Sequence, residues 1–292
     1  MTQEKTPSKR RIYTWHGQYR FINPEWVDAI AQSSLGNLDE WQFYNTGEML
    51  VGGSDQKNHV FRVSTCKGPV IFKRYRISTL IFRRYKISVN WRYFMRSGRA
   101  AGEWAGLTAM DKVGIPVPEI VGFGEDRRFG RLVGGYIITR ELESAMDLAM
   151  FAQNVWYAMQ PLKKKAVLSE IRSKLFYLVK KAHDHNLFHR DLTWKNILVR
   201  KESDGYRLWF IDCPRFKSRR IGRSYLQMVD LSCLTKMALE VLTITERYRS
   251  LLIFLEGDRA KTRKIFREIT LRHAKSARAK AKSGKFKPNR PE

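Results

Sequence analysis

Short alternations of apolar and polar residues dominate the first half of the chain and predict β-strands. Turn-forming stretches rich in Gly, Ser and Asp separate these runs. Between the third and fourth runs, apolar residues at helical spacing cover residues 97–113, and Gly114 follows as a typical C-cap. The pattern predicts a five-stranded antiparallel sheet with one helix. The five runs are residues 48–51, 58–63, 69–73, 119–123 and 136–139.

After residues 140–143 the apolar residues adopt helical spacing, most clearly between Leu168 and Ala182, with Asn186 at the end. We therefore predict an α+β protein in which a sheet-containing lobe precedes a mainly helical lobe. The expected segments are an N-terminal extension (1–40, of which 1–11 is disordered), a first lobe (41–143), a second lobe (144–273) and a disordered basic tail (274–292).

The chemistry lies in the second lobe, in the run from His189 to Val199 and in the Asp212 that follows a second apolar run. The spacing His-Arg-Asp-x-x-x-x-Asn is typical of phosphoryl-transfer enzymes. Asp191 is then the base that accepts a proton from the substrate hydroxyl, and Asn196 and Asp212 are the Mg²⁺ ligands. The alternative is that Asp191 and Asn196 are turn formers and that Asp212 only ends a strand.

A nucleotide site needs a cation on the phosphates, and Lys73 ends the third predicted strand. Glu103 is its predicted ion-pair partner, because no other acidic residue lies between Lys73 and Asp111. The alternative is a solvated lysine and a glutamate on a helix surface. Candidate ATP contacts are also the turn Gly52, Gly53 and Ser54, where backbone amides could approach phosphates, and Glu141 in the segment between the lobes.

Charge narrows the choice of partners. The 292 residues include 55 Lys and Arg against 28 Asp and Glu, a net charge of +27, which favours a polyanion. Three widely spaced cysteines indicate neither a disulfide framework nor a zinc site. The chain shows no signal peptide and no apolar run long enough to span a membrane, so we expect a cytoplasmic protein.

Two basic clusters could bind that polyanion. Residues 74–99 hold eight basic side chains interleaved with aromatic ones, as at a lipid headgroup interface, although a helix with a buried aromatic face is equally compatible. The second cluster follows Asp212 and should flank the acceptor site, together with Lys195 of the catalytic run. Its members are Arg215, Lys217, Arg219, Arg220 and Arg223.

The chain resembles the lipopolysaccharide kinase (Kdo/WaaP) family between about Trp41 and Leu239. The residues that carry the resemblance include Lys73, Glu103, the catalytic run and Asp212; the shared segments are 114–118, 136–142, 189–199, 211–212 and 230–231. It implies a bilobal protein-kinase-like fold and phosphate transfer from ATP to an inner-core sugar, heptose or Kdo, of lipopolysaccharide. It also implies an anionic glycolipid as substrate and a peripheral position at the cytoplasmic face of the inner membrane.

Departures from protein kinases bear on the acceptor. Cys213-Pro214 replaces Phe-Gly after Asp212, and only residues 213–229 separate Asp212 from Asp230, too few for a long activation loop and a peptide platform. We expect Asp230 to brace the catalytic loop and His189 to be a packing residue. An atypical, RIO-like protein kinase and a noncatalytic module that binds RNA or anionic membrane remain alternatives. Nucleic acid is disfavoured, because no zinc-finger, helix-turn-helix or RNP-type motif is present.

Overall fold

A computed structural model describes residues 17–52, 58–76 and 98–282 of the chain. The chain divides into two compact units. The first unit comprises residues 1–108 and 118–143, and the second comprises residues 109–117 and 144–292. The main division after Glu143 coincides with the change from strand to helix spacing in the sequence.

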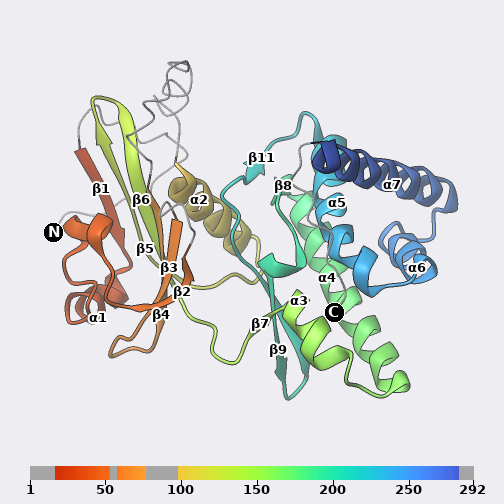
Figure 1. The fold of residues 1–292 in the computed structure, drawn as a ribbon, viewed down its shortest axis with the longest axis horizontal. Helices are drawn as coiled ribbons and strands as arrows, with labels where there is room; N and C mark the ends of the chain where they lie inside the picture. The colour runs from red at the N-terminus through yellow and green to blue at the C-terminus, as the bar shows by residue number, and fades with distance from the viewer. Residues whose placement is uncertain (1–16, 53–57, 77–97, 283–292) are drawn as a thin grey trace. The chain divides into compact units, whose positions relative to one another are not determined.

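The first unit is built on one antiparallel sheet of six strands (Figure 1), with the order β1-β5-β6-β4-β3-β2. The predicted count of five is wrong, because β1 in the N-terminal extension pairs with β5 from Gly17 opposite Arg127 to Ile22 opposite Gly122. That pairing satisfies the backbone along the outer edge of β5. The strands are β1 (Gly17–Ile22), β2 (Glu48–Gly52), β3 (Asn58–Val63), β4 (Val70–Arg76), β5 (Ile120–Arg128) and β6 (Arg131–Arg140).

The rest of the extension completes the core of this unit. Trp26, Ile30 and Trp41 are buried with Phe61 and Phe72 of the sheet, so the segment before residue 41 is integral to the unit. The helical elements are the 3-10 turns η1 (Pro24–Trp26) and η2 (Leu38–Phe43) and the helices α1 (Val27–Ala31) and α2 (Arg99–Lys112).

The second unit is mainly helical. Its central helix α4 buries an apolar face that includes Ile171, Leu175 and Val179. Burying apolar surface stabilises a fold by about 25 cal/mol per Å², and burial of this face is the main contribution of α4 to stability. The helical elements are α3 (Leu148–Met150), the π-helical turn η4 (Phe151–Trp156), α4 (Pro161–Asp184), the 3-10 turn η5 (Trp194–Asn196), α5 (Arg223–Val241), α6 (Ile244–Phe254) and α7 (Arg259–Lys282).

Five short strands hold the functional loops of the second unit. β9 and β10 form an antiparallel hairpin with β7 beside β9, and β11 pairs with β8. The strands are β7 (Met146–Asp147), β8 (Leu187–Phe188), β9 (Ile197–Glu202), β10 (Gly205–Phe210) and β11 (Lys217–Ser218).

The C-terminal segment differs from its prediction. A disordered tail was expected from residue 274, but α7 continues through Lys282, and residues 283–292 lie outside the described part. The segment is rich in Ala, Lys and Arg, which are among the strongest helix formers, so the helix extends beyond its packed part. Low apolar content alone was a poor guide here.

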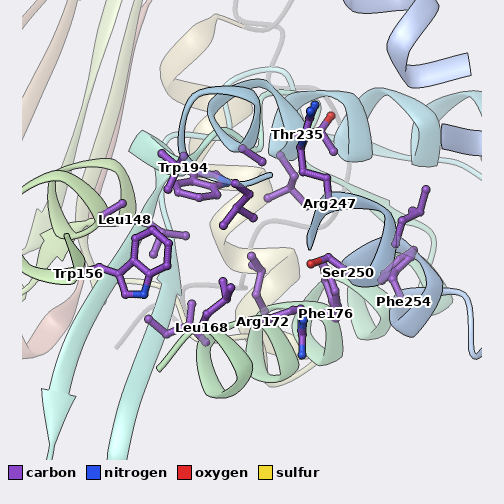
Figure 2. Close-up of a pocket in the computed structure, with 18 of the residues that line it drawn as sticks. Leu148, Trp156, Leu168, Arg172, Phe176, Trp194, Thr235, Arg247, Ser250 and Phe254 are labelled. Atoms are coloured by element: carbon purple, nitrogen blue, oxygen red, sulfur yellow. The ribbon is translucent and has the colours of Figure 1, made fainter. Parts of the chain in front are cut away.

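Helices α4, α5 and α6, together with α3, η4 and η5, line an apolar cavity of about 110 Å³ (Figure 2). Its wall is almost entirely hydrocarbon, but Nε of Arg172, Nε of Arg247 and Oγ of Ser250 are buried at its lining. These three atoms have no hydrogen-bond partner among the described residues. Buried polar atoms without a partner destabilise a fold, so a substitution that removes one of them should be stabilising.

Candidate active site

The first unit contains the predicted lysine and glutamate in direct contact. Lys73 lies in the middle of β4, opposite Val60 of β3 and Ile137 of β6. Its Nζ donates to Oε1 of Glu103 at 2.7 Å, and the glutamate side chain, on α2, is 1% exposed. The ion pair predicted from the sequence is present; its role in holding nucleotide phosphates stays a prediction.

A tyrosine that the sequence reasoning did not identify shares this carboxylate. The hydroxyl of Tyr75 donates to Oε2 of Glu103 at 2.6 Å. Tyr75 follows Lys73 by two positions on β4, so both side chains point to the same face of the sheet. This alternation of side chains along a strand is the sequence signal that could have identified Tyr75. Two donors on two oxygens fix both the position and the rotation of the Glu103 carboxylate.

The other predicted contacts of this unit have mixed outcomes. Gly52 ends β2, and Gly53 and Ser54 lie outside the described residues. Glu141 accepts a hydrogen bond from Nε of Arg62 at 2.7 Å, and its own backbone N–H donates to the carbonyl of Pro69. The N–H of Glu141 is thus already used within the unit, and a role for this residue in adenine binding stays a prediction.

The catalytic run of the second unit is a tight loop between β8 and β9. The strand register places Phe210 opposite Ile197, so Asn196 and Asp212 leave the same end of the β9–β10 hairpin. The backbone N–H of Ile211 donates to the carbonyl of Asn196 at 3.0 Å and extends this pairing. Nδ2 of Asn196 donates to the carbonyl of Asp191 at 2.7 Å, which ties the candidate base to the candidate metal ligand.

The donor set fits Mg²⁺. Because Nδ2 of Asn196 donates within the loop, its amide oxygen is the atom that would face a metal, and the Asp212 carboxylate would be the second protein ligand. Oxygen ligands of this kind suit Mg²⁺, which takes one or two protein ligands and completes its shell with water and phosphate. Within the described residues no group of three His, Cys, Asp or Glu side chains forms a metal cage.

Asp230 braces the catalytic loop, as the sequence predicts. This α5 residue is 1% exposed and accepts hydrogen bonds from the backbone N–H of His189 at 3.2 Å and of Arg190 at 2.6 Å. Nε2 of His183 lies 3.1 Å from the Asp230 carboxylate and donates to it. His183, on α4, was not predicted from the sequence, because a histidine near a helix end gives no sign of a partner at residue 230.

His189 is a buried packing residue, also as predicted. Its ring meets Phe210 edge to face at 6.3 Å, and its Nε2 bonds to the carbonyl of Ile211 at 2.9 Å. Burial lowers the pKa of His189 more strongly than the neighbouring carboxylates of Asp230, Asp212 and Asp191 raise it. The ring is therefore neutral near pH 7 and connects the loop with the strand end that carries Asp212.

The basic cluster after Asp212 is anchored to the same loop. Lys217 pairs with Phe188 across β11 and β8, the carbonyl of Arg215 accepts from Nη1 of Arg190, and the N–H of Arg219 donates to the carbonyl of Asn186. Arg223 forms an ion pair with Asp184 at 3.0 Å. Lys195 and most of the cluster are exposed, as a substrate-binding role requires; that role stays a prediction. The exposed members are Arg215, Lys217, Arg219 and Arg220.

The other basic segment, residues 74–99, is described only at its ends. Arg74 to Arg76 belong to β4, and α2 begins at Arg99; residues 77–97 lie outside the described part. Arg74 is 6% exposed and its guanidinium donates to the carbonyls of Gln42 and Tyr44, so this arginine is a core residue and not part of a binding surface.

Comparison with known proteins gives the chain a family. Residues 42–254 match the model of the lipopolysaccharide kinase (Kdo/WaaP) family. A 3-deoxy-D-manno-octulosonic acid kinase of Haemophilus influenzae (strain PittEE) is 28% identical over 130 residues, 44% of this chain and 48% of the relative. The lipopolysaccharide core heptose(I) kinase WaaP of Pseudomonas aeruginosa is 26% identical over 174 residues, 58% of this chain and 63% of the relative.

The alignment with the first of these curated relatives spans about half of the relative's length. A solved structure, WaaP in complex with acyl carrier protein, superposes with a TM-score of 0.62 over 90% of this chain and 98% of that chain, at 19% identity, and shows the shared fold. The family model covers more than two thirds of the chain, including Lys73, Glu103, Asp191, Asn196 and Asp212. This chain belongs to the lipopolysaccharide kinase (Kdo/WaaP) family.

Proposed function

We propose that this protein is an ATP-dependent kinase that phosphorylates an inner-core sugar, a heptose or Kdo, of lipopolysaccharide or a related anionic glycolipid. The observation that carries the proposal is the β9–β10 hairpin end, where Asn196 and Asp212 emerge together and Asp191 is tied to Asn196 by a hydrogen bond. Family membership supports the acceptor class, since the curated relatives are named as kinases of these sugars.

Each residue has one task in the reaction. ATP with Mg²⁺ supplies the phosphoryl group, and Asn196 and Asp212 are the residues that would hold the metal. Asp191 accepts the proton of the sugar hydroxyl. The hydroxyl oxygen then bonds to the γ-phosphorus of ATP, and the bond between the γ-phosphorus and the ADP oxygen breaks. Lys73, oriented by Glu103, neutralises phosphate charge. The basic cluster from Arg215 to Arg223 binds anionic groups of the acceptor.

A sugar acceptor is favoured over a peptide. Residues 213–222 form only a short connection in which β11 pairs with β8, and α5 begins at Arg223. A long loop that could offer a peptide platform does not occur between Asp212 and α5. Pro214, two residues after Asp212, has a fixed φ angle, so we expect the Asp212 carboxylate to stay in one position during turnover.

We also propose that the protein works at the cytoplasmic face of the inner membrane, in peripheral contact with its glycolipid. Among the described helices, none combines the length and apolar character needed to cross a bilayer. The excess of positive charge supports attraction to an anionic surface.

Phosphate transfer from radiolabelled ATP to purified core glycolipid tests the proposal. Wild-type protein and Asp204→Ala, a matched change at an exposed aspartate of the same unit, should both transfer phosphate. Asp191→Ala should lower kcat by at least about a hundredfold, the range reported for general-base loss. Equal transfer by Asp191→Ala, or no transfer by the wild type, would refute the proposal.

The same assay addresses the alternatives. Preferential labelling of the protein itself or of an added protein would favour a RIO-like protein kinase. Absence of measurable Mg²⁺-ATP binding, together with salt-sensitive binding of RNA or anionic lipid, would favour a noncatalytic module.

A further inference from the structure

Helix α7 packs against the second unit through one face only. Thr262 and Ile269 are buried, and Ile265 and Phe266 pack with them against residues of α5 and α6 such as Met228 and Leu251. Figure 1 shows α7 running beside α5. The inner face therefore accounts for the stability of this helix, and its outer face is open to another role.

The outer face is strongly cationic. The helix contains ten Lys and Arg residues and one acidic residue, Glu268, which pairs with Nε of Arg272 at 3.7 Å. Like charges at a spacing of three or four residues destabilise a helix by a few tenths of a kcal/mol per pair, so this density does not serve folding. The exposed basic residues of α7 are Arg259, Lys261, Arg263, Lys264, Arg267, Lys275 and Arg278.

A cation–π contact made by the half-buried Arg272 joins α7 to the basic cluster that follows Asp212. The guanidinium of Arg272 lies 5.2 Å from the ring centre of Tyr225, in the first turn of α5. Tyr225 follows Arg223 by two residues, so the basic cluster adjoins α7 where its packed face meets its exposed face. We call the combined area the α7 surface: residues 219–225 with the exposed side of α7.

The α7 surface also contains large exposed apolar side chains. Ile221 is 82% exposed, Tyr225 is 60% exposed, and Leu271, next to Arg272, is 51% exposed. Exposed aliphatic side chains beside Lys and Arg suit the headgroup region of a bilayer, where the apolar groups enter the lipid and the cations meet phosphates. RNA offers planar bases and phosphates, and an aliphatic isoleucine or leucine adds little to its binding.

We propose that the α7 surface docks the protein on a bilayer that contains anionic phospholipid. The inference rests on the proposed function, because a glycolipid acceptor is presented within such a bilayer. It deepens that function by assigning membrane contact to named residues, including a helix whose C-terminal part the sequence predicts to be a disordered basic tail. Binding is reversible and salt-sensitive, since most of its energy comes from basic residues near the headgroups.

Co-sedimentation of the full chain with vesicles of phosphatidylcholine, with and without phosphatidylglycerol, tests this. The triple substitution Arg267→Gln, Lys275→Gln and Arg278→Gln, at three exposed residues of α7, should lower partitioning to anionic vesicles by roughly a hundredfold, because each basic residue near the surface adds about fivefold. The control Lys163→Gln, Lys165→Gln and Lys201→Gln removes three exposed charges of the same unit, outside the α7 surface, and should retain most of the binding.

A second pair of variants separates bilayer from nucleic acid. Ile221→Ser should lower vesicle partitioning by roughly threefold to tenfold, the loss for one partly inserted aliphatic side chain, and should leave binding of a single-stranded RNA unchanged. Leu162→Ser, at an equally exposed leucine on α4, should change neither. Both substitutions are at exposed positions, and unchanged far-UV circular dichroism verifies that the variants are folded.

Three results would overturn the inference: equal binding to vesicles with and without phosphatidylglycerol, equal loss in the two charge triplets, or RNA binding tighter than vesicle binding with no effect of Ile221→Ser. Asp191→Ala should bind vesicles like the wild type. Vesicle binding without phosphate transfer would therefore reject the proposed function alone, and transfer without vesicle binding would reject this inference alone.

Discussion

Replacing Asp230 by Asn tests how the catalytic loop is held. The substitution preserves the shape of a side chain that is 1% exposed, but it turns one acceptor oxygen into a donor and removes the charge. In the wild type, Oδ1 accepts from the backbone of Arg190, and Oδ2 accepts from the backbone of His189 and from His183. An asparagine side chain has only one acceptor oxygen, so it cannot accept hydrogen bonds at both carboxylate positions.

The cost follows from counting donors. If the amide oxygen takes the Oδ2 position, the new NH₂ group faces the N–H of Arg190, whose nitrogen lies 2.6 Å from Oδ1 in the wild type. The charge-assisted bond to this N–H, worth about 1.5–3 kcal/mol, is replaced by a contact between two donors, and the part-buried N–H is left without an acceptor. Some relaxation is expected, so we predict a loss of about 3 kcal/mol from a total stability of roughly 5–15 kcal/mol.

Urea unfolding at neutral pH measures this loss as a lower midpoint at unchanged slope. Asp204→Asn, at an exposed turn between β9 and β10, controls for the charge change and should cost less than about 0.5 kcal/mol. In the transfer assay, Asp230→Asn should lower kcat by about a hundredfold with little change in the KM for ATP, because Asp191 is displaced while nucleotide contacts remain.

His183→Ala adds a direct check of the network. If His183 acts through Asp230, the two substitutions should be non-additive by about 1 kcal/mol or more in a double-mutant cycle. An Asp230→Asn protein as stable as Asp204→Asn, with unchanged kcat, would refute the idea that this carboxylate holds the loop.

Four further predictions concern single side chains. Tyr75→Phe removes the hydroxyl bond to the glutamate beside Lys73 and should lower kcat/KM for ATP by about fivefold, measured by steady-state kinetics, with no loss expected if the hydroxyl is idle. Burial lowers the pKa of His189 in the folded protein, so below the ordinary pKa of 6.5 the ring gains a proton when the protein unfolds. The free energy of unfolding should therefore fall as the pH drops from about 6.5 toward the lowered folded-state pKa. A urea midpoint that stays the same between about pH 7 and pH 5.5 would contradict this. Exposed Cys66 should react first with a thiol reagent at about pH 8, whereas burial raises the pKa of Cys233 to about 11 and should keep it unreactive; Cys66→Ser should remove the fast phase. Ser250→Ala deletes a buried hydroxyl without a partner among the described residues and should raise stability by about 1 kcal/mol in urea unfolding, and a loss of stability would show that this hydroxyl has a partner in solution.

The catalytic hairpin could be predicted because its determinants are local. Ile197, Leu198 and Val199 directly follow Asn196, and Leu208 to Ile211 directly precede Asp212. Two apolar runs joined by a short turn form an antiparallel pair, and antiparallel pairing brings the start of one strand beside the end of the other. The polar residues at these two positions then meet without further information.

The sixth strand and the end of α7 could not be predicted with the same rules. β1 forms because β5 offers an unpaired edge about a hundred residues later in the chain, which no local window contains. For residues 274–282, low apolar content predicted disorder, while their Ala, Lys and Arg residues favour helix once Ile265, Phe266 and Ile269 have fixed the preceding turns. The composition of a segment shows how much apolar surface it can bury. It does not show whether an adjacent folded turn starts a helix that the segment then continues.

Two left-handed backbone conformations at the site are flanked by contacts between residues far apart in the sequence. Arg190 has φ 65° and Asp212 has φ 56°, left-handed values that cost a non-glycine residue about 1–2 kcal/mol each. Such a conformation persists only where surrounding bonds fix it. Asp230 holds the N–H of Arg190, and His189 and Asn196 hold the two backbone groups of Ile211, the residue before Asp212. The strained residues are Arg190, next to Asp191, and Asp212, the candidate metal ligand. Asp230 and His189 hold these conformations and so set the geometry of the reacting groups, although neither needs to touch the substrate. Substitutions there should reduce kcat more than they weaken binding, and a glycine at position 190, which relieves the strain, should be tolerated better than an alanine.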